Sequence, residues 1–350
     1  MSSVLRKPVR LGLTPSDIHT NTDLRLHNTL SLPAKAEFFA TFHSVPELLS
    51  ILRWTEQHEL PLRILGGGSN VLMRPLVSGV VLRSGMRAIQ PLNNDGSHCW
   101  VAVDAGVNWH DWVVASRTWG FGLENLALIP GTVGASPIQN IGAYGVEVAD
   151  CIEHVEGIQR STQQWHRWSA NDCRFGYRDS LFKHELADDV IITRVVFRLS
   201  KHFQPTLSYG PLQSLQEQHD LTPEQLVDAI CRIRRSKLPD PASIPNAGSF
   251  FKNPLVSNQV AQSLLQQYPT MPVYWQPNNQ AKLAAGWLIE QVGWRGRGLS
   301  HAKMHDQQAL VLTTDGNASL ADVEALQVAV QGAVMSQFSV TLEPEPQYFG

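Results

Sequence analysis

The sequence predicts an α+β protein with two or three domains. Capped helical segments and short apolar runs typical of strands both occur along the 350 residues, without an internal repeat. A long uncharged segment over 129–145, IPGTVGASPIQNIGAYG, has neither strand nor helix periodicity. The proline cluster Pro239-Asp240-Pro241 marks a boundary between domains. We therefore expect a glycine-rich functional segment set between sheets and helices.

Composition narrows the class of protein. The formal net charge is −3, and 43% of the residues are hydrophobic against 17% charged. This balance gives no reason to expect a nucleic-acid or membrane partner, and no apolar run approaches the ~18 residues of a membrane span. The four cysteines form no CxxC pair, and His301 and His305 have no third ligand nearby in the sequence. We expect a soluble, cytoplasmic protein without a metal site.

The predicted elements follow from caps and apolar spacing. Residues 1–20 are polar and unpatterned, and we expect a loose extension there. Ser44, Asn108, Thr222 and Ser319 each stand where a helix cap is expected. The predicted helices begin at these caps, the second running to Trp119 and the last to about Gln337, and further helices are expected over 260–267 and 282–292. Predicted strands cover 62–65, 80–82, 100–103, 190–192, 195–197 and 339–342, the last returning to the first domain.

Two glycine-rich segments are candidates for binding a cofactor. Gly66-Gly67-Gly68-Ser69-Asn70 follows a predicted strand, where backbone N–H groups can form a nest for a pyrophosphate. It is neither a Walker A loop nor a Rossmann fingerprint, since both patterns are absent. In 129–145, glycine permits close approach of the backbone to a large flat ligand. Each segment alone is also compatible with tight structural turns, but together they favour one extended dinucleotide, FAD.

Three residues are candidates for chemistry, each with an ordinary structural alternative. Ser249 lies between small residues and two aromatics, where a hydroxyl can be partly desolvated, but it lacks the GxSxG elbow of hydrolases. Arg178 can bind a carboxylate in fork geometry, or form a salt bridge to an acid such as Asp179. Glu345 follows a predicted strand and a proline, a position where most glutamates are solvated.

Four cations gather at the end of the predicted helix that begins after Thr222. Arg232, Arg234, Arg235 and Lys237 suit the negative end of the helix dipole, which explains the arginines without a ligand. Lys237 precedes Leu-Pro-Asp-Pro, which would fix its ammonium group and suits a phosphate contact.

Nine ordered segments of the chain closely resemble the UDP-N-acetylenolpyruvoylglucosamine reductases, also called UDP-N-acetylmuramate dehydrogenases, of type I. These segments are LGGGSNVL (65–72), GLENLALIPGTVGASPIQNIGAYGVE (122–147), CRFGYRDSLFKHE (173–185), LSYGPL (207–212), KLPDP (237–241), NAGSFFKNP (246–254), KLAAGWLIEQ (282–291), HDQQALVL (305–312) and LEPE (342–345). They span most of the chain in the family's order. The extension before residue 20 has no clear counterpart in the family.

The resemblance implies an FAD-binding fold of the vanillyl-alcohol-oxidase (PCMH) type in two subdomains, with an α/β substrate-binding domain. The expected ranges are 1–20 for the extension, 21–88 with 339–350 for the first subdomain, 89–238 for the second and 239–338 for the substrate domain. It implies FAD and, as co-substrate, NADPH. The FAD-binding positions would be Gly66, Gly67, Gly68, Ser69, Asn70, Ile129, Pro130, Gly131, Ala135, Ser136, Ile138, Asn140, Gly142 and Ala143. No histidine or cysteine lies in either loop, so we expect a non-covalent flavin.

The resemblance also implies the reaction and the residues that perform it. NADPH would reduce FAD, which then reduces the enolpyruvyl ether of UDP-N-acetylglucosamine in peptidoglycan synthesis. Arg178 and Glu345 would stabilise the enolate-like intermediate, and Ser249 would protonate its α-carbon. Substrate-binding positions would be Tyr144, Tyr209, Lys237, Asn253, Tyr274 and Gln308. A related flavin-dependent sugar or lactone oxidase and a non-catalytic flavin or nucleotide-sugar sensor remain alternatives, and a monomer is expected.

Overall fold

The first sheet contains the N-terminal strands. The computed structural model describes residues 18–350, so 1–17 of the expected extension lie outside the described residues, whereas 18–20 belong to strand β1. The strand order is β1-β2-β5-β3, with β2, β5 and β3 parallel and β1 antiparallel to β2. In that order the strands are Ile18–Asp23, Lys35–Phe42, Leu76–Ser84 and Leu62–Ile64. Helix α1 (Val45–Gln57) begins at Ser44 as predicted, because the Ser44 hydroxyl accepts from Glu47 N, and it buries Leu48 and Ile51 against this sheet.

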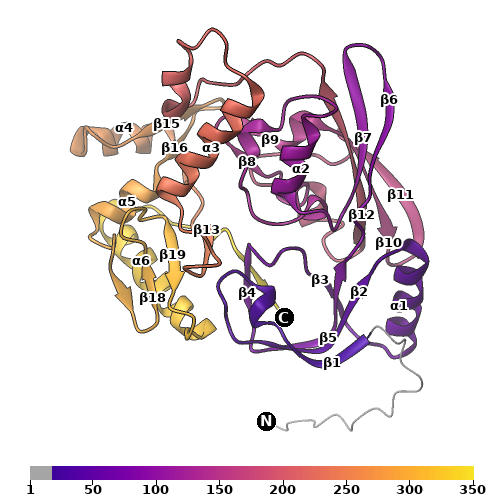
Figure 1. Cartoon of the computed structure of the whole chain (residues 1–350). Helices are drawn as coiled ribbons and strands as arrows, with labels where there is room; N and C mark the ends of the chain where they lie inside the picture. The colour runs from indigo at the N-terminus through magenta and orange to yellow at the C-terminus, as the bar shows by residue number, and fades with distance from the viewer. Residues whose placement is uncertain (1–17) are drawn as a thin grey trace, which may run out of the picture.

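The second sheet has five antiparallel strands in the order β11-β10-β12-β7-β6. In that order they are Gln164–Ser169, Ile152–Gln159, Val190–Ser200, His98–Asp104 and Ile89–Asn94. The β-branched residues of β12 are buried on both faces, which suits the central strand of this sheet. Helix α2 (Trp109–Ser116) and helix α3 (Pro223–Lys237) lie beside it in Figure 1. Thr222 and Gln225 form the predicted reciprocal capping box of α3.

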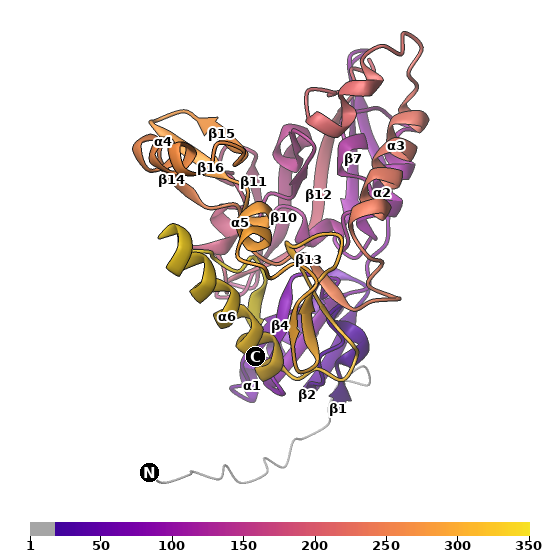
Figure 2. The ribbon, with the colours of Figure 1, turned by 90° about the vertical axis from the view of Figure 1, so that its left-hand side faces the viewer.

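Residues from 246 onward form a third region with two small sheets. One sheet is ordered β13-β19-β18-β17, and the other β14-β16-β15. Their strands are β13 Asn246–Ser249, β19 Val311–Thr314, β18 Ala302–Met304, β17 Gly298–Leu299, β14 Leu255–Ser257, β16 Gln280–Leu283 and β15 Val273–Gln276. The helices are α4 (Asn258–Gln267), α5 (Ala285–Gln291) and α6 (Leu320–Phe338). Figure 2 shows α4 with β14 to β16 standing apart from the second sheet, across from α2 and α3.

The chain then returns to the N-terminal part of the molecule. Strand β20 (Gln347–Phe349) pairs in parallel with β4 (Val71–Met73), which follows the Gly66–Asn70 segment. In Figure 1 the yellow end of the chain runs among the indigo strands, beside β4. A return was expected, but the predicted strand over 339–342 is wrong. Val340 and Leu342 are buried as irregular chain in the core, and the pairing strand lies five residues further on.

Two predicted helix bounds also need correction. The second helix ends at Ser116 instead of Trp119, because the last residues form single turns back to Ala115 O and Ser116 O. The helix expected over 282–292 begins only at Ala285, because Lys282 and Leu283 belong to β16. Asn253 Oδ1 accepts from Ala285 N at 2.9 Å and thereby caps α5 from another segment of the chain.

The hydrophobic core joins the first and third regions. One cluster contains Leu24 and Val77 from the first region with Phe250, Leu288 and Leu326 from the third. A second cluster lies within the five-stranded sheet and its helices. None of the helices in residues 18–350 is long and apolar enough to span a membrane. A third cluster, which includes Leu62, packs α1 against the first sheet, and the larger cavity described below is lined by residues of all three clusters.

Short 3-10 helices and one small hairpin complete the described structure. The 3-10 helices are η1 Arg25–His27, η2 Glu124–Leu126, η3 Val133–Ala135, η4 Val148–Cys151, η5 Leu181–Lys183 and η6 Gly210–Leu215. The hairpin pairs β8 (Gly142–Ala143) with β9 (Val146–Glu147). The stretch 129–145 thus contains only one 3-10 turn and one strand of two residues, as its lack of periodicity predicts.

Candidate functional site

The two glycine-rich segments pack directly against each other. A Cβ atom on Gly67 would lie 2.7 Å from Gly131 Cα, closer than real Cβ contacts come. Gly68 has φ +65°, and a Cβ there would lie within van der Waals overlap of the His27 carbonyl oxygen. Ser69 donates its hydroxyl to Pro130 O at 3.2 Å. Glycine is therefore required here by close backbone approach, and the two backbones form one wall.

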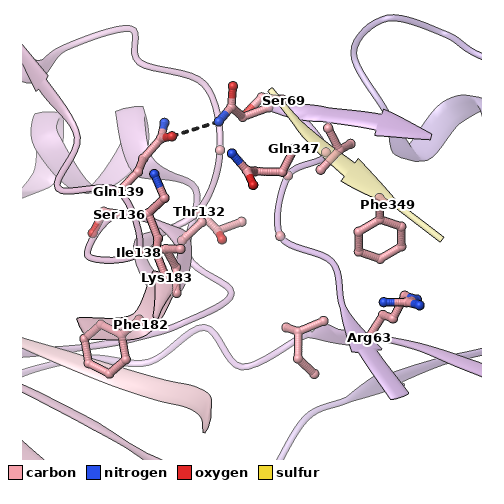
Figure 3. A pocket seen from close by; sticks show the side chains of 18 of the residues that line it. Arg63, Ser69, Thr132, Ser136, Ile138, Gln139, Phe182, Lys183, Gln347 and Phe349 are labelled. Atoms are coloured by element: carbon pink, nitrogen blue, oxygen red, sulfur yellow. Dashed lines mark hydrogen bonds between the residues drawn. The ribbon is translucent and has the colours of Figure 1, made fainter. Parts of the chain in front are cut away.

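This wall lines the larger of two adjoining cavities, with a volume of about 380 Å³ (Figure 3). The predicted cofactor positions that line it are Gly66, Gly67, Gly68, Ser69, Asn70, Pro130, Gly131, Ala135, Ser136 and Ile138. Asn70 donates to Gln139 Oε1 at 2.8 Å, the hydrogen bond drawn as a dashed line at Gln139 in Figure 3. The volume lies within the usual range for cofactor sites. A long, uncharged glycine wall with a few polar groups fits an extended dinucleotide.

Four predicted cofactor positions lie elsewhere. Ile129 and Gly142 line the smaller cavity instead, and Ala143 lines neither. Asn140 is fully buried, and its side chain donates to Glu147 Oε2 and Gly176 O while accepting from Ala149 N. An amide satisfied in this way stabilises the 140–149 turn. The Asn140 side chain is thus satisfied within the protein, and its place among the FAD-binding positions stays a prediction.

The smaller cavity, of about 200 Å³, brings together the three predicted catalytic residues. Arg178, Ser249 and Glu345 all line it, although they come from three distant parts of the sequence. Ser69, Asn70, Pro130, Gln139 and Ile141 line both cavities. A ligand in the larger cavity can therefore meet a ligand in the smaller one at this shared wall.

Arg178 is held by backbone and by an acid. Its Nη2 donates to Gly142 O at 2.7 Å, and its Nε lies 3.3 Å from Glu345 Oε1. The Arg178 backbone has φ +55°, a left-handed conformation that costs energy in a non-glycine residue. Lys183 Nζ donates to Arg178 O at 2.8 Å and helps to hold this conformation. The expected alternative was a salt bridge to Asp179 or another acid, and Arg178 pairs with another acid, Glu345, whereas Asp179 pairs with His184 at 2.8 Å.

Glu345 is anchored beside the serine segment. Its backbone N donates to Phe250 O at 2.8 Å, and Phe251 bridges to Pro344. Burial raises the pKa of Glu345, while Arg178, Lys252 and Lys183 act in the opposite direction. A raised pKa in a cavity beside a guanidinium marks a carboxyl group that can share or hold a proton. The solvated glutamate that its sequence position suggested is not what the structure contains.

Ser249 lies at the end of β13, which pairs with β19. In residues 18–350 the Ser249 hydroxyl makes no hydrogen bond, and it is exposed to the smaller cavity. The preceding Gly248 has φ +71°, so the chain turns sharply there. A hydroxyl presented in this way can approach a ligand without first breaking a protein contact.

The predicted substrate-binding residues differ in their relation to the smaller cavity. Asn253 lines it, and Gln308 lies above the start of α5, with Oε1 3.3 Å from where a Gly286 Cβ would be. The Tyr144 and Tyr209 rings meet edge to face at 5.6 Å between centroids. Tyr274, in β15, is exposed. Of these residues only Asn253 lines the smaller cavity, and the other four line neither cavity.

Lys237 does not line the cavity; it is exposed at the end of α3. One turn earlier, Arg234 does line it, and its Nε is buried without a hydrogen bond in residues 18–350. Burial lowers the pKa of Arg234, the Tyr144 hydroxyl opposes that shift, and Arg178 adds a second positive charge nearby. Sequence analysis explained Arg234 by the helix dipole and missed it as a cavity residue. Its spacing after Ile230 and Cys231, both buried, was the available signal.

Two further lining or neighbouring residues were not predicted. Lys282 Nζ lies 3.5 Å from the Tyr177 ring centroid, and Tyr177 lines the smaller cavity. Burial lowers the pKa of Lys282, with Arg178 adding to the effect. No group of three metal-ligating side chains occurs in the described part of the chain.

Comparison with known proteins gives matches over most of the chain. Residues 36–163 match the family model described as FAD binding domain. Residues 240–349 match the model of UDP-N-acetylenolpyruvoylglucosamine reductase, C-terminal domain. The first match contains the residues that line both cavities, and the second contains Ser249 and Glu345.

Relatives and a solved structure agree with these matches. UDP-N-acetylenolpyruvoylglucosamine reductase from Dechloromonas aromatica (strain RCB) is 44% identical over 334 residues, covering 93% of this chain and 98% of the relative. The enzyme of that name from Pseudomonas fluorescens (strain Pf0-1) is 42% identical over 336 residues, covering 95% and 99%. The crystal structure of the reductase from Thermus caldophilus superposes with a TM-score of 0.64 at 24% identity, covering 94% of this chain and 98% of that one. This superposition confirms the predicted fold class.

Proposed function

This chain belongs to the UDP-N-acetylenolpyruvoylglucosamine reductase family, and we propose that it reduces UDP-N-acetylglucosamine enolpyruvate to UDP-N-acetylmuramate in peptidoglycan synthesis. The observation that carries this proposal is the meeting of Arg178, Ser249 and Glu345 in one cavity that opens on a glycine-walled cofactor cavity. NADPH serves as the reductant. A bound FAD supplies the hydride chemistry, taking a hydride from NADPH and passing it to the enolpyruvyl β-carbon.

We propose that the first and second regions hold FAD between them and that the third region covers the substrate. Backbone N–H groups of Gly66 to Asn70 would face the pyrophosphate. The residues that line the larger cavity, all within 18–350, include no histidine or cysteine. We therefore infer a non-covalent flavin. A monomer is proposed as the active form.

Arg178 and Glu345 are proposed to act on charge that develops in the reaction. Hydride addition at the β-carbon places negative charge on the α-carbon and its carboxylate. Arg178 is pre-positioned by Gly142 O and by Glu345, so it stabilises that charge without reorganising. The raised pKa of Glu345 favours the protonated carboxyl, which can donate a hydrogen bond to the same charge.

Ser249 is proposed as the proton donor to the α-carbon. Its hydroxyl is open to the cavity, and Glu345 is bound through backbone to Phe250, the next residue. The nearby guanidinium lowers the cost of forming an alkoxide, which a serine acting as acid must become. Ser249 therefore matters only when substrate, not NADPH, is the reactant.

Arg234 is proposed as an additional anion-binding residue of this site. Its cation is buried next to Arg178 and forms no ion pair within residues 18–350. A buried cation without a partner is unfavourable, so the missing anion is expected from the ligand. Of the predicted set, we propose that Asn253, Tyr144, Tyr209, Tyr274 and Gln308 contact the rest of the substrate and that Lys237 contacts its diphosphate.

The test separates the two half-reactions. Under anaerobic conditions NADPH should bleach the flavin of both wild type and Ser249→Ala at similar rates. Reoxidation by UDP-N-acetylglucosamine enolpyruvate should be slowed about 10²- to 10⁴-fold in Ser249→Ala, as expected for loss of a general acid. Ser243→Ala, an exposed serine, is the matched control.

Three other outcomes would count against the proposal. Equal slowing of both half-reactions in Ser249→Ala would show that the residue is not the proton donor. Fast reoxidation by O₂ with no response to the enolpyruvyl substrate would favour the oxidase alternative. Flavin or nucleotide-sugar binding without any turnover would favour a sensor.

A further inference from the structure

Lys183 brings a positive charge to the end of the cofactor cavity nearest the catalytic residues. It ends η5, a turn fixed by Ser180, whose hydroxyl donates to Ile138 O at 2.6 Å and accepts from Phe182 N. The half-buried side chain lines the larger cavity, and Figure 3 shows it rising beside Ser136 and Ile138 toward Gln139. Its ammonium thus stands at the wall that the two cavities share.

The described part of the protein engages only one of the three hydrogen-bond donors of the Lys183 ammonium. In residues 18–350 that group donates one hydrogen bond, to Arg178 O, and forms no ion pair. An ammonium has three donors, so two remain for a ligand. The charges that face it are Lys252, Arg178, Asp179 and Glu345. Burial and the two cations lower the pKa of Lys183, the acids raise it less, and the site therefore favours an additional negative charge.

The orientation of a flavin in the larger cavity follows from which end lies near the catalytic residues. Its other lining cations are Arg63 and Arg160, and Figure 3 shows Arg63 across the cavity from Lys183. Hydride transfer requires the reacting ring of a flavin at the end shared with Arg178 and Ser249. The ring therefore belongs at the Lys183 end, and the adenosine part at the Arg63 end.

We propose that Lys183 is the cation that stabilises the negative charge of the reduced flavin and thereby raises its reduction potential. This inference rests on the FAD-dependent function proposed above. NADPH gives up two electrons and one proton as a hydride and becomes NADP⁺, so the flavin gains one negative charge in that step. A fixed ammonium beside the flavin favours the negatively charged product of the step over its neutral reactant. Lys183 is then also a positioning residue for Arg178, through the bond to its carbonyl.

Three substitutions separate charge from positioning. Lys183→Gln keeps a donor for Arg178 O but removes the charge, Lys183→Met removes both, and Lys183→Arg keeps both. Each holoenzyme is equilibrated anaerobically with a reference dye, without any UDP-sugar, and the ratio of reduced to oxidised flavin is read from absorbance. Arg63→Gln, at the far end of the cavity, is the control.

The Gln and Met variants should both show at least a tenfold fall in that ratio, equivalent to about 30 mV for a two-electron couple. Lys183→Arg should recover most of it, and Arg63→Gln should change it less than twofold. The pH at which the reduced flavin takes up a proton, seen in its spectrum, should rise in the Gln and Met variants.

A wild-type ratio in Lys183→Gln would overturn the proposal, since the donor alone would then suffice. A loss of FAD affinity without a change in the ratio would also overturn it and point to a phosphate contact. Failure of the enolpyruvyl substrate to reoxidise the flavin would contradict the proposed function but not this inference, because the dye measurement needs no substrate.

Discussion

Gly67→Ala tests whether the contact between the two glycine segments supports the cofactor cavity. The added methyl group would lie 2.7 Å from Gly131 Cα, at least 0.7 Å short of the 3.4 Å at which ordinary contact begins. Neither segment is free to retreat. Gly68 O accepts from Thr29 N at 3.0 Å, and Gly131 O accepts from Trp109 N at 3.1 Å. The methyl group must therefore strain or break backbone hydrogen bonds on one side.

The expected loss of stability is about 2–4 kcal/mol. Overpacking of a filled site costs about 1–3 kcal/mol, and a disturbed backbone hydrogen bond adds about 1 kcal/mol. Urea denaturation of the FAD-free protein measures this change through the midpoint. If the loop moves to relieve the strain and the FAD site thereby loses about 1.4 kcal/mol of binding free energy, FAD affinity falls about tenfold. Flavin fluorescence during a titration with FAD measures this fall.

Gly332→Ala is the matched control. Gly332 lies within α6, and nothing lies within 4 Å of the point that an added Cβ would occupy, so alanine should stabilise the helix by about 0.5–1 kcal/mol. A wild-type midpoint and wild-type FAD affinity in Gly67→Ala would refute the argument that close backbone approach explains this glycine.

The remaining predictions concern two buried charged groups. Arg234→Met should stabilise the ligand-free protein by about 1 kcal/mol, because a buried cation without an ion pair is removed. It should also weaken UDP-N-acetylmuramate binding at least tenfold in a flavin-absorbance titration, whereas Arg232→Met, exposed on the other side of α3, should change neither. Glu345 has a raised pKa in the folded chain, so its contribution is favourable below the unfolded glutamate pKa and is lost as pH rises through the folded pKa. Glu345→Gln should therefore gain stability relative to wild type as pH rises from about 4 to about 8, and a constant difference over that range would contradict the burial argument.

Helices with their caps in the local sequence were predicted well, and those capped from elsewhere were not. Thr222 with Gln225 and Ser319 with Asp322 each form reciprocal boxes that begin α3 and α6. The start of α5 is set by Asn253, which is 32 residues away in the sequence. Lys282 and Leu283 precede it as a strand, because β14 and β15 offer pairing partners on both sides. Local pattern contains no information about such partners.

The site shows the same division. The resemblance identified Arg178, Ser249 and Glu345, and the structure brings all three to one cavity. The structure does not place Asn140 at the lining of either cavity, since its side-chain amide is satisfied by other protein groups. Arg234 could be predicted from its helical spacing, but only once the face bearing Ile230 was known to be buried.

The pairing of β20 with β4 has a consequence for how the enzyme is made. Gln347, Tyr348 and Phe349 line the larger cavity, and Glu345 lines the smaller one, yet Asn70 and β4 are synthesised about 275 residues earlier. A nascent chain that ends at residue 340 has both glycine segments but lacks one wall of each cavity. The segment 343–349 must also close a very long loop before it gains any pairing energy. Stable flavin uptake is thus expected only after segment 343–349 has been made and has paired with β4, so that bound cofactor reports the closure of this long loop.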